Sequence, residues 1–154
     1  MDGLALLGYR DAELLRQAIA GKVRRFTYST PVTTCAATAS IQATIGIDSA
    51  SNFQCDRLTG RCYYDTGNDI NRAADWEVVP MPRLELIDTG SGATLFDRTD
   101  VVFKSIWGRA TDPLELPQPH VFGARSVVTV IFINIAAVAL RFQVSLHGFK
   151  LYKE

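Results

Sequence analysis

The segment LRFQVSLHG, residues 140–148, alternates strictly between apolar and polar side chains. A period of two puts the two kinds of side chain on opposite faces of a β-strand. We expect one set to face a core and the other to face out: Leu140, Phe142, Val144 and Leu146 inward, and Arg141, Gln143, Ser145 and His147 outward. The preceding segment, RSVVTVIFIN, is rich in β-branched residues, as a central strand should be. This part of the chain therefore has to form β-sheet.

The same period continues back toward residue 24. SIQATIGID alternates with one apolar face, formed by Ile41, Ala43, Ile45 and Ile47. The other expected strands are RRFTYST, SNFQCD and RCYYD around a turn at 58–60, and LELI and ATLF around a turn at 88–92. DVVFKSIWG follows them, and TDPLELPQPHVF is expected as a loop punctuated by prolines. Roughly seven or eight short strands separated by turns predict an all-β fold, an antiparallel β-sandwich of jelly-roll or Greek-key type.

The first 21 residues carry the one helical pattern. Leu14, Leu15, Ala18 and Ile19 recur at helical spacing, Asp11 can cap the start, and Gly21 can end the helix in a left-handed conformation. We therefore expect an N-terminal helical arm over residues 1–21 and a β-sandwich domain over residues 22–154.

Length and charge exclude several classes of function. The 154 residues suit one domain, and 47% of them are hydrophobic, which is an ordinary globular composition. Lys plus Arg and Asp plus Glu both number 16, a balance that argues against a nucleic-acid binder. The basic run KVRRF fits the start of a solvated strand. No secretory signal is visible, and the most apolar segment, 127–140, is too short to span a membrane and contains Asn134.

Two Asp-Thr-Gly triplets, beginning at Asp65 and Asp88, raise the possibility of an aspartic protease. That chemistry needs two carboxylates close enough to share a proton. The triplets are too close in sequence to belong to two homologous lobes, and 15 residues between Gly90 and Ile106 leave no room for a substrate-covering hairpin. Asp, Gly and Ser are also turn formers. We therefore interpret residues 88–92 as a hairpin turn.

The remaining reactive residues suggest no site. Cys55 and Cys62 could face each other across a hairpin, but we favour three reduced, buried thiols that include Cys35. The cysteine spacing and the distant His120 and His147 do not fit a metal site. Trp76 and Trp107 with Tyr63 and Tyr64 could line a sugar-binding face, or could serve as core and rim residues. We expect no catalytic residue, no cofactor site and no metal site.

From about Phe26 onward the chain resembles the virion accessory proteins of tailed bacteriophages, which are small β-sandwich proteins that decorate or cement an icosahedral capsid. The resemblance covers roughly three-quarters of the chain and lies in an order of features. These are RRFTYSTPVTTCAATASIQATIGIDSASNF, then LELIDTGSGATLFD, then SIWGRATDPLELPQPHVFGARSVVTVIFIN, and finally LRFQVSLHGFKLY. The family brings no catalytic residues.

The resemblance implies a non-enzymatic cement or decoration protein of the virion, made in the host cytoplasm. Its partners would be the major capsid protein or other virion subunits, and a homo-oligomer, a dimer or trimer, is expected. Two segments are candidate partner contacts, the arm and the proline-rich loop: Leu4, Leu6, Leu7, Leu14, Ile19, Leu114, Leu116 and Pro117. Near-zero net charge suits contacts outside a shell better than contacts with packaged DNA. The alternatives are a tail, connector or vertex component, and a carbohydrate-binding module.

Overall fold

The computed structural model describes residues 20–65, 82–94, 101–102 and 113–152. These residues form β-strands, turns and bends, with no helix among them. The helix expected within residues 1–21 lies outside the described part, except for residues 20 and 21. Gly21 has a φ of +72°, the left-handed conformation predicted for it. The all-β prediction is confirmed for the described residues.

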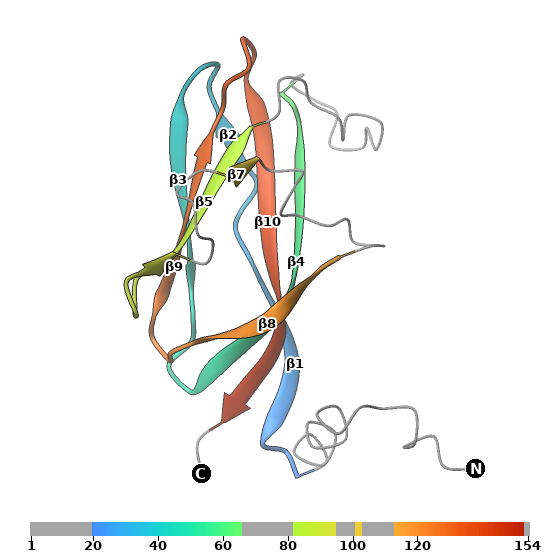
Figure 1. The fold of residues 1–154 in the computed structure, drawn as a ribbon, viewed down its shortest axis with the longest axis vertical. Helices are drawn as coiled ribbons and strands as arrows, with labels where there is room; N and C mark the ends of the chain where they lie inside the picture. The colour runs from blue at the N-terminus through green and yellow to red at the C-terminus, as the bar shows by residue number, and fades with distance from the viewer. Residues whose placement is uncertain (1–19, 66–81, 95–100, 103–112, 153–154) are drawn as a thin grey trace, which may run out of the picture.

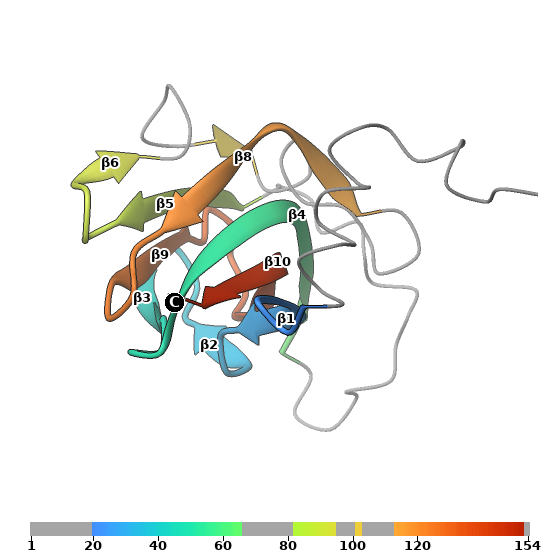
Figure 2. The same ribbon diagram turned by 90° about the horizontal axis from the view of Figure 1, so that it is seen from below.

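Ten described strands form two antiparallel sheets (Figures 1 and 2). The first sheet has the order β1-β10-β4-β8, with β2 also paired to β10: Val23–Ser29, Leu140–Tyr152, Ser51–Tyr64, Leu114–Phe122 and Thr33–Cys35. The second has the order β3-β9-β5-β6, with β7 also paired to β5: Ser40–Gly46, Val127–Ile133, Arg83–Asp88, Ala93–Thr94 and Val101–Val102.

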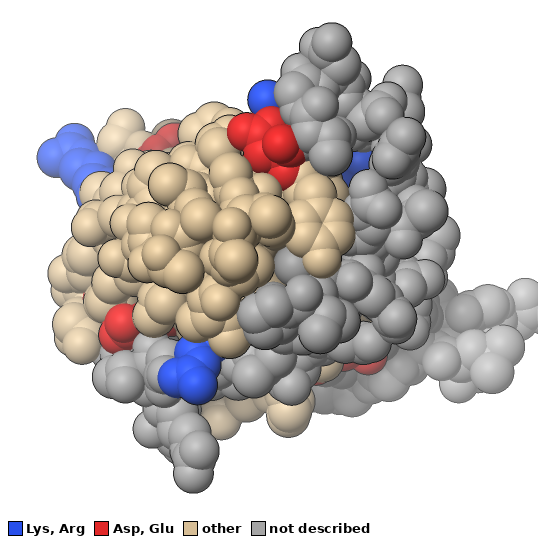
Figure 3. All heavy atoms as spheres, turned by 90° about the horizontal axis from the view of Figure 1, so that it is seen from above, with Lys and Arg blue, Asp and Glu red and all other residues tan. Residues whose placement is uncertain are grey.

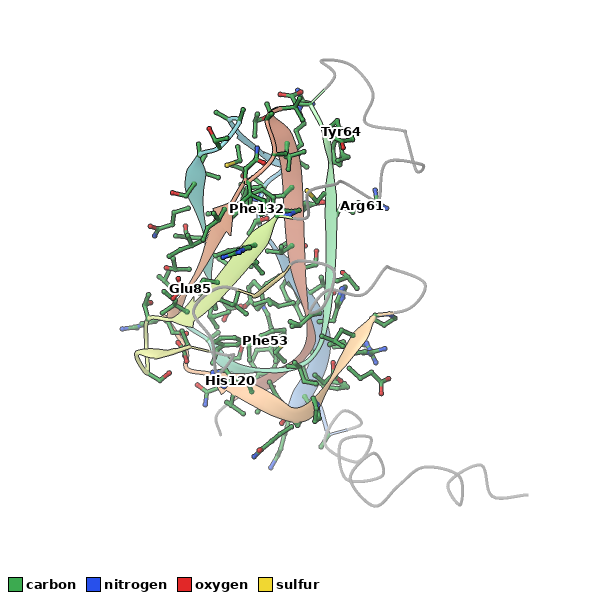
Figure 4. All side chains as sticks on the ribbon, turned by 45° about the horizontal axis from the view of Figure 1, so that its top comes forward. Phe53, Arg61, Tyr64, Glu85, His120 and Phe132 are labelled. Carbon is green, nitrogen blue, oxygen red and sulfur yellow. The ribbon has the colours of Figure 1, made fainter. Side chains whose placement is uncertain are left out.

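The buried faces of the two sheets share one hydrophobic core. Phe132 on β9 stacks on Phe142 on β10, with ring centroids 4.1 Å apart and an interplanar angle of 4°. Near the other end, Phe53 on β4 stacks on Phe122 on β8 at 6.4 Å. Figure 4 shows Phe53 and Phe132 between the sheets. Stacked aromatic pairs of this kind add to the stabilisation that burial of their area already gives.

In the strands whose apolar and polar residues alternate strictly, the predicted inward-facing residues are the buried ones. On β10 the four predicted inward residues are fully buried, and the four predicted outward residues are half-buried on the opposite face. On β3 and the residue after it, Ala43, Ile45 and Ile47 are buried and Ile41 packs against the core. The predicted hairpin also forms, because β5 pairs with β6 through Ile87↔Thr94 and Asp88↔Ala93. Gly92 in its turn has a φ of +70°.

The turn predicted at 58–60 is wrong. Residues 51–64 form one continuous strand, β4, and Leu58, Thr59 and Gly60 stand opposite Leu146, Ser145 and Val144 of β10. The pairing with β10 extends from Ser51 to Tyr64 and is interrupted by one bulge between His147 and Gly148. Tertiary pairing over this length outweighs the local turn preference of a Thr-Gly pair.

The prediction of a proline-punctuated loop over this segment is also wrong, because residues 114–122 form strand β8. β8 is the last strand of its sheet and pairs only with β4 among the described strands. Proline cannot donate to a ladder of hydrogen bonds, but Pro117 and Pro119 lie between the paired residues Glu115 and His120, where β8 has no register partner in β4. The described part of the chain contains no helix whose length and apolar character would allow it to cross a membrane.

Candidate interaction surfaces

β8 bows away from its neighbour where its prolines stand. His120 pairs with Cys55 and Glu115 pairs with Arg57, so residues 116–119 all face the single residue Asp56. We define the β8 arch as Leu114 together with residues 116–119. Leu114 and Leu116 are half-buried against the core, and Pro117 is exposed. The structure thus brings the three predicted contact residues of this segment onto one edge strand.

His120 ties the β8 arch to the β5–β6 hairpin of the other sheet. Its Nε2 lies 3.2 Å from Oδ2 of Asp88, and its ring packs edge-on against Phe122 at 4.6 Å. Figure 4 shows His120 at the lower end of the two sheets. This contact crosses from the first sheet to the second, so it fixes one end of the arch.

Asp88 serves as the acceptor that organises its own turn. The amide N–H of Gly90 donates to Oδ1 at 2.9 Å, and Ser91 Oγ donates to Oδ2 at 2.8 Å. Burial raises the pKa of Asp88, but the hydrogen bonds from Ser91, His120 and Gly90 outweigh burial and hold the pKa below its usual value. The Ser91 hydroxyl donates to the carboxylate of its own turn, whereas the serine of a serine hydrolase donates to the imidazole of its triad.

Asp65 lies far from Asp88. Its amide N–H donates to Ala139 O beside the start of β10, and its carboxylate pairs with Arg141, Nε to Oδ1 at 2.9 Å. Asp88 instead pairs with Val128 near the start of β9, at the opposite end of the sheets. The two aspartates therefore form no dyad. Residues 66 and 67 of the first triplet lie outside the described residues.

His147 bridges three strands on the outer face of the first sheet. Its Nδ1 lies 2.9 Å from Thr27 Oγ1 on β1, and its Nε2 lies 2.7 Å from Thr59 Oγ1 on β4. Burial lowers the pKa of His147 below its ordinary value, and the positive charge of Arg25 lowers it further. Both ring nitrogens are engaged by hydroxyl groups, so the side chain links strands.

The three cysteines are free and buried. Cys55 and Cys62 lie on the same strand, β4, and not on two arms of a hairpin. Burial raises the pKa of both thiols to about 12, with a further contribution from the charge of Asp56 for Cys55 and from neighbouring Cys35 for Cys62. Burial also raises the pKa of Cys35. Such thiols are poor nucleophiles and poor ligands.

Lys150 is a buried cation, 8% exposed, near the end of β10. Its ammonium group pairs with Asp48 and lies 3.8 Å from the centroid of the Phe26 ring. Burial would lower the pKa of Lys150, but the hydrogen bonds and charges of Asp48 and Tyr28 raise it. The ion pair fixes the lysine in its charged form, which suits a structural contact and not a nucleophile.

Two loops at one end of the described part of the chain carry no charged residue. They are the β2–β3 turn, residues 36–39, and the β9–β10 loop, residues 134–139, and we call this pair of loops the uncharged end. Ile135 is 43% exposed and Val138 47% exposed, beside exposed Ala36 and Ala137. Figure 3 views this end and shows uncharged side chains over its centre, with charged ones toward the rim of the described surface.

The buried side chain of Asn134 links the two loops of the uncharged end by hydrogen bonds. This side chain is 1% exposed, and its Nδ2 donates to the carbonyls of Cys35, Ala36 and Val138 at 3.3, 2.9 and 2.8 Å. Its Oδ1 accepts from the amide of Ala136 at 2.8 Å. One buried amide thus satisfies four backbone groups, which holds the exposed apolar residues in a fixed arrangement.

Other predicted contacts and platforms lie outside the described residues. These are Leu4, Leu6, Leu7, Leu14, Ile19, Trp76 and Trp107. Tyr63 and Tyr64 end β4 and are half-buried. Arg24 and Arg25 are exposed at the start of β1, as predicted, and Arg25 lies over the Phe149 ring at 5.4 Å. Among the described residues, no three His, Cys, Asp or Glu side chains gather as metal ligands would.

Sequence reasoning did not identify the uncharged end. The signal was present, because no charged residue occurs between Phe26 and Ile47 or between Val127 and Leu140.

Comparison of the chain with protein-family models finds no match. Comparisons with curated proteins and with solved structures likewise find no match.

Proposed function

We propose that this chain is a non-enzymatic structural protein of a tailed-phage particle, a cement or decoration protein that stabilises the icosahedral shell. Its partner in this role is the major capsid protein or another virion subunit, and its location is the virion. The order of sequence features given above supports this proposal. So does the two-sheet architecture of the described residues, which agrees with a β-sandwich. The jelly-roll or Greek-key type, the domain over residues 22–154 and the arm over residues 1–21 are part of the proposal.

The uncharged end is the observation that carries the proposal. Exposed apolar groups that are clustered and rimmed by polar residues are typical of protein–protein contacts. Asn134 holds Ile135 and Val138 in place before any partner arrives, so binding orders few groups. The β8 arch, with Leu114, Leu116 and Pro117, is a second contact in the proposal, and the arm residues provide a third.

The internal use of the polar side chains favours a binding role over a catalytic one. Asp88 accepts three hydrogen bonds within the fold, His147 bridges two threonines, and Lys150 pairs with Asp48. A catalytic group has to face a substrate with its reactive atom available. In the described part of the chain these candidates are engaged by partners within the fold.

The test mixes the purified chain with empty shells of the phage that encodes it, and follows the mixture by light scattering and calorimetry. We expect saturable addition to the shells and a rise in their melting temperature. Ile135→Asp/Val138→Asp should abolish addition, because each new charge would be desolvated in the contact. Val121→Asp, at an equally exposed apolar residue on β8, is the matched control and should still add.

Failure of the wild-type chain to bind shells would contradict the cement proposal. Addition to assembled tails or connectors in place of shells would instead assign the chain to another part of the virion. Retention of binding by Ile135→Asp/Val138→Asp would show that the uncharged end is not the contact.

A further inference from the structure

β3 is the first strand of the second sheet, and one of its two edges has no described partner. It pairs with β9 on one side, and no strand of the described residues pairs on the other. Figures 1 and 2 show it at the outer edge of its sheet. Ile47 N donates to Ser126 O, and Asn134 N donates to Ala39 O. Odd-numbered residues therefore bond toward β9, and the backbone groups of Ser40, Gln42, Thr44 and Gly46 point away from it.

These four residues are exposed to solvent. Gly46 is informative because glycine has no side chain, so its exposed surface is backbone. The free edge of β3 is therefore open at this end.

β3 lacks the features that normally protect an edge strand. Charged residues, proline, bulges and very short length all discourage pairing with another chain. β3 has seven residues, no charge and no proline, and its register with β9 is unbroken. The other described edges are protected: β8 carries Glu115 and two prolines, β1 carries Arg24 and Arg25, and β2, β6 and β7 have three residues or fewer. The part of β4 that β8 does not cover, residues 59–64, carries Arg61.

We propose that β3 is a homodimer interface, in which it pairs antiparallel with β3 of a second copy and joins two second sheets into one. A two-fold axis brings each residue close to its own copy, so a charged edge would repel itself. The run from Phe26 to Ile47 has no charge, so this edge does not repel a second copy of itself. This inference concerns the isolated chain and does not depend on the proposed function.

The alternation requires even-numbered residues to pair with even-numbered residues, and of these registers the one centred on Ala43, the middle residue of β3, pairs all seven residues of the strand. Residues whose backbone groups point outward have to meet each other, which a pairing centred on Ala43 achieves. Ser40 then stands opposite Gly46 of the second copy, and Gln42 opposite Thr44. In each of these pairs the two residues exchange two backbone hydrogen bonds. Ile41 stands opposite Ile45 of the second copy, on the side of the sheet that already faces the core.

The experiment measures the mass of the chain alone by light scattering over about a hundredfold range of concentration. We expect a reversible dimer. Thr44→Lys should weaken it at least about tenfold, because it adds like charges beside the two-fold axis. Thr44 is exposed, so the circular dichroism spectrum and melting temperature should stay those of the wild-type monomer. Gln118→Lys puts the same charge on the β8 edge and is the matched control, which should still dimerise.

A double variant tests the register. In Gln42→Glu/Thr44→Lys the new lysine stands opposite the new glutamate of the second copy, so the dimer should return. A wild-type monomer at every concentration would overturn the proposal, as would a dimer that Gln118→Lys dissociates and Thr44→Lys does not. Failure of the double variant to restore the dimer would overturn the pairing centred on Ala43. Shell binding is not measured here, so neither result depends on the cement proposal.

Discussion

His147 shows how a titratable side chain on the outer face of a sheet becomes a structural link. Its two ring nitrogens meet hydroxyl groups from the strands on either side, Thr27 and Thr59. The ring is half-buried and Arg25 lies close by, so a second positive charge is disfavoured there. The neutral form of the imidazole is therefore the form that the fold stabilises.

This preference predicts a dependence of stability on pH. The folded-state pKa of His147 lies below the unfolded value near 6.5. Between the two values the unfolded chain binds more protons, so the contribution of His147 is present above about pH 6.5 and is lost as pH falls through the folded-state pKa. Urea midpoints of the wild type should decrease from about pH 7.5 to about pH 5.5. The decrease should be smaller in His147→Gln, and an equal decrease in both proteins would refute the assignment.

Asn134 illustrates what a sequence leaves out at the scale of a residue. In the sequence it is only a polar residue that interrupts an apolar run. Its role depends on Cys35 and Ala36, which are distant in the chain and reach it only because β2 and β9 end at the same end of the molecule. Outward-facing His147, in contrast, was predictable, because alternation along one strand is a local property.

At the scale of elements, the long pairing of β4 with β10 depends on one glycine. Gly148 follows the bulge and is buried, and a Cβ atom there would overlap the carbonyl oxygen of Gln54 and lie 2.9 Å from Cys55 Cα. Only a residue without a side chain lets the two backbones approach so closely. The bulge therefore requires glycine for steric reasons.

Gly148→Ala should reduce the free energy of unfolding by about 4 kcal/mol or more, because backbone atoms cannot move aside as a flexible side chain can. Gly123→Ala is the matched control: nothing lies within 4 Å of its Cβ position, and its effect should stay within about 0.5 kcal/mol. Urea denaturation measures both. Near-wild-type stability of Gly148→Ala would show that the close approach is absent in solution.

The sequence predicts those strands whose pattern is local. β3, β9, β10 and the β5–β6 hairpin follow from alternation, β-branched residues and turn formers. β4 and β8 do not, because their structure depends on where they lie in the sheet. β4 stays extended through Thr59-Gly60 since β10 pairs with these residues. β8 tolerates Pro117 since residues 116–119 have no register partner in β4.

At the scale of the whole molecule, the stack of Phe132 on Phe142 joins the two sheets. Each ring comes from the middle of its own sheet, since β9 lies between β3 and β5 and β10 lies between β1 and β4. Neither sheet can keep its buried face out of water without the other. The two sheets should therefore unfold together.

Phe142→Ala should cost about 3–5 kcal/mol and weaken both sheets at once. Phe149→Ala removes the same group from the half-buried outer face of β10 and should cost about 1 kcal/mol. Urea denaturation gives the two losses, and amide exchange shows where protection falls. In Phe142→Ala we expect faster exchange in both β1 and β3. Faster exchange confined to one sheet would mean that the sheets are stable separately.

The candidate contacts at this scale were predictable only in part. The β8 arch was identified from its prolines and leucines, although as a loop. The uncharged end and the open edge of β3 are defined by charges that are missing over segments far apart in the sequence. Their meaning depends on which strands end together and which strand lies last in a sheet, and only the assembled topology shows this.

The place of β10 in the first sheet has a consequence for how the chain is made. β1, β2 and β4 all pair with β10, yet every one of them leaves the ribosome before it. Until β10 emerges these strands lack their common partner, and half of the shared core has nothing to cover it. Folding is therefore expected to follow synthesis of this strand and to occur in one late step.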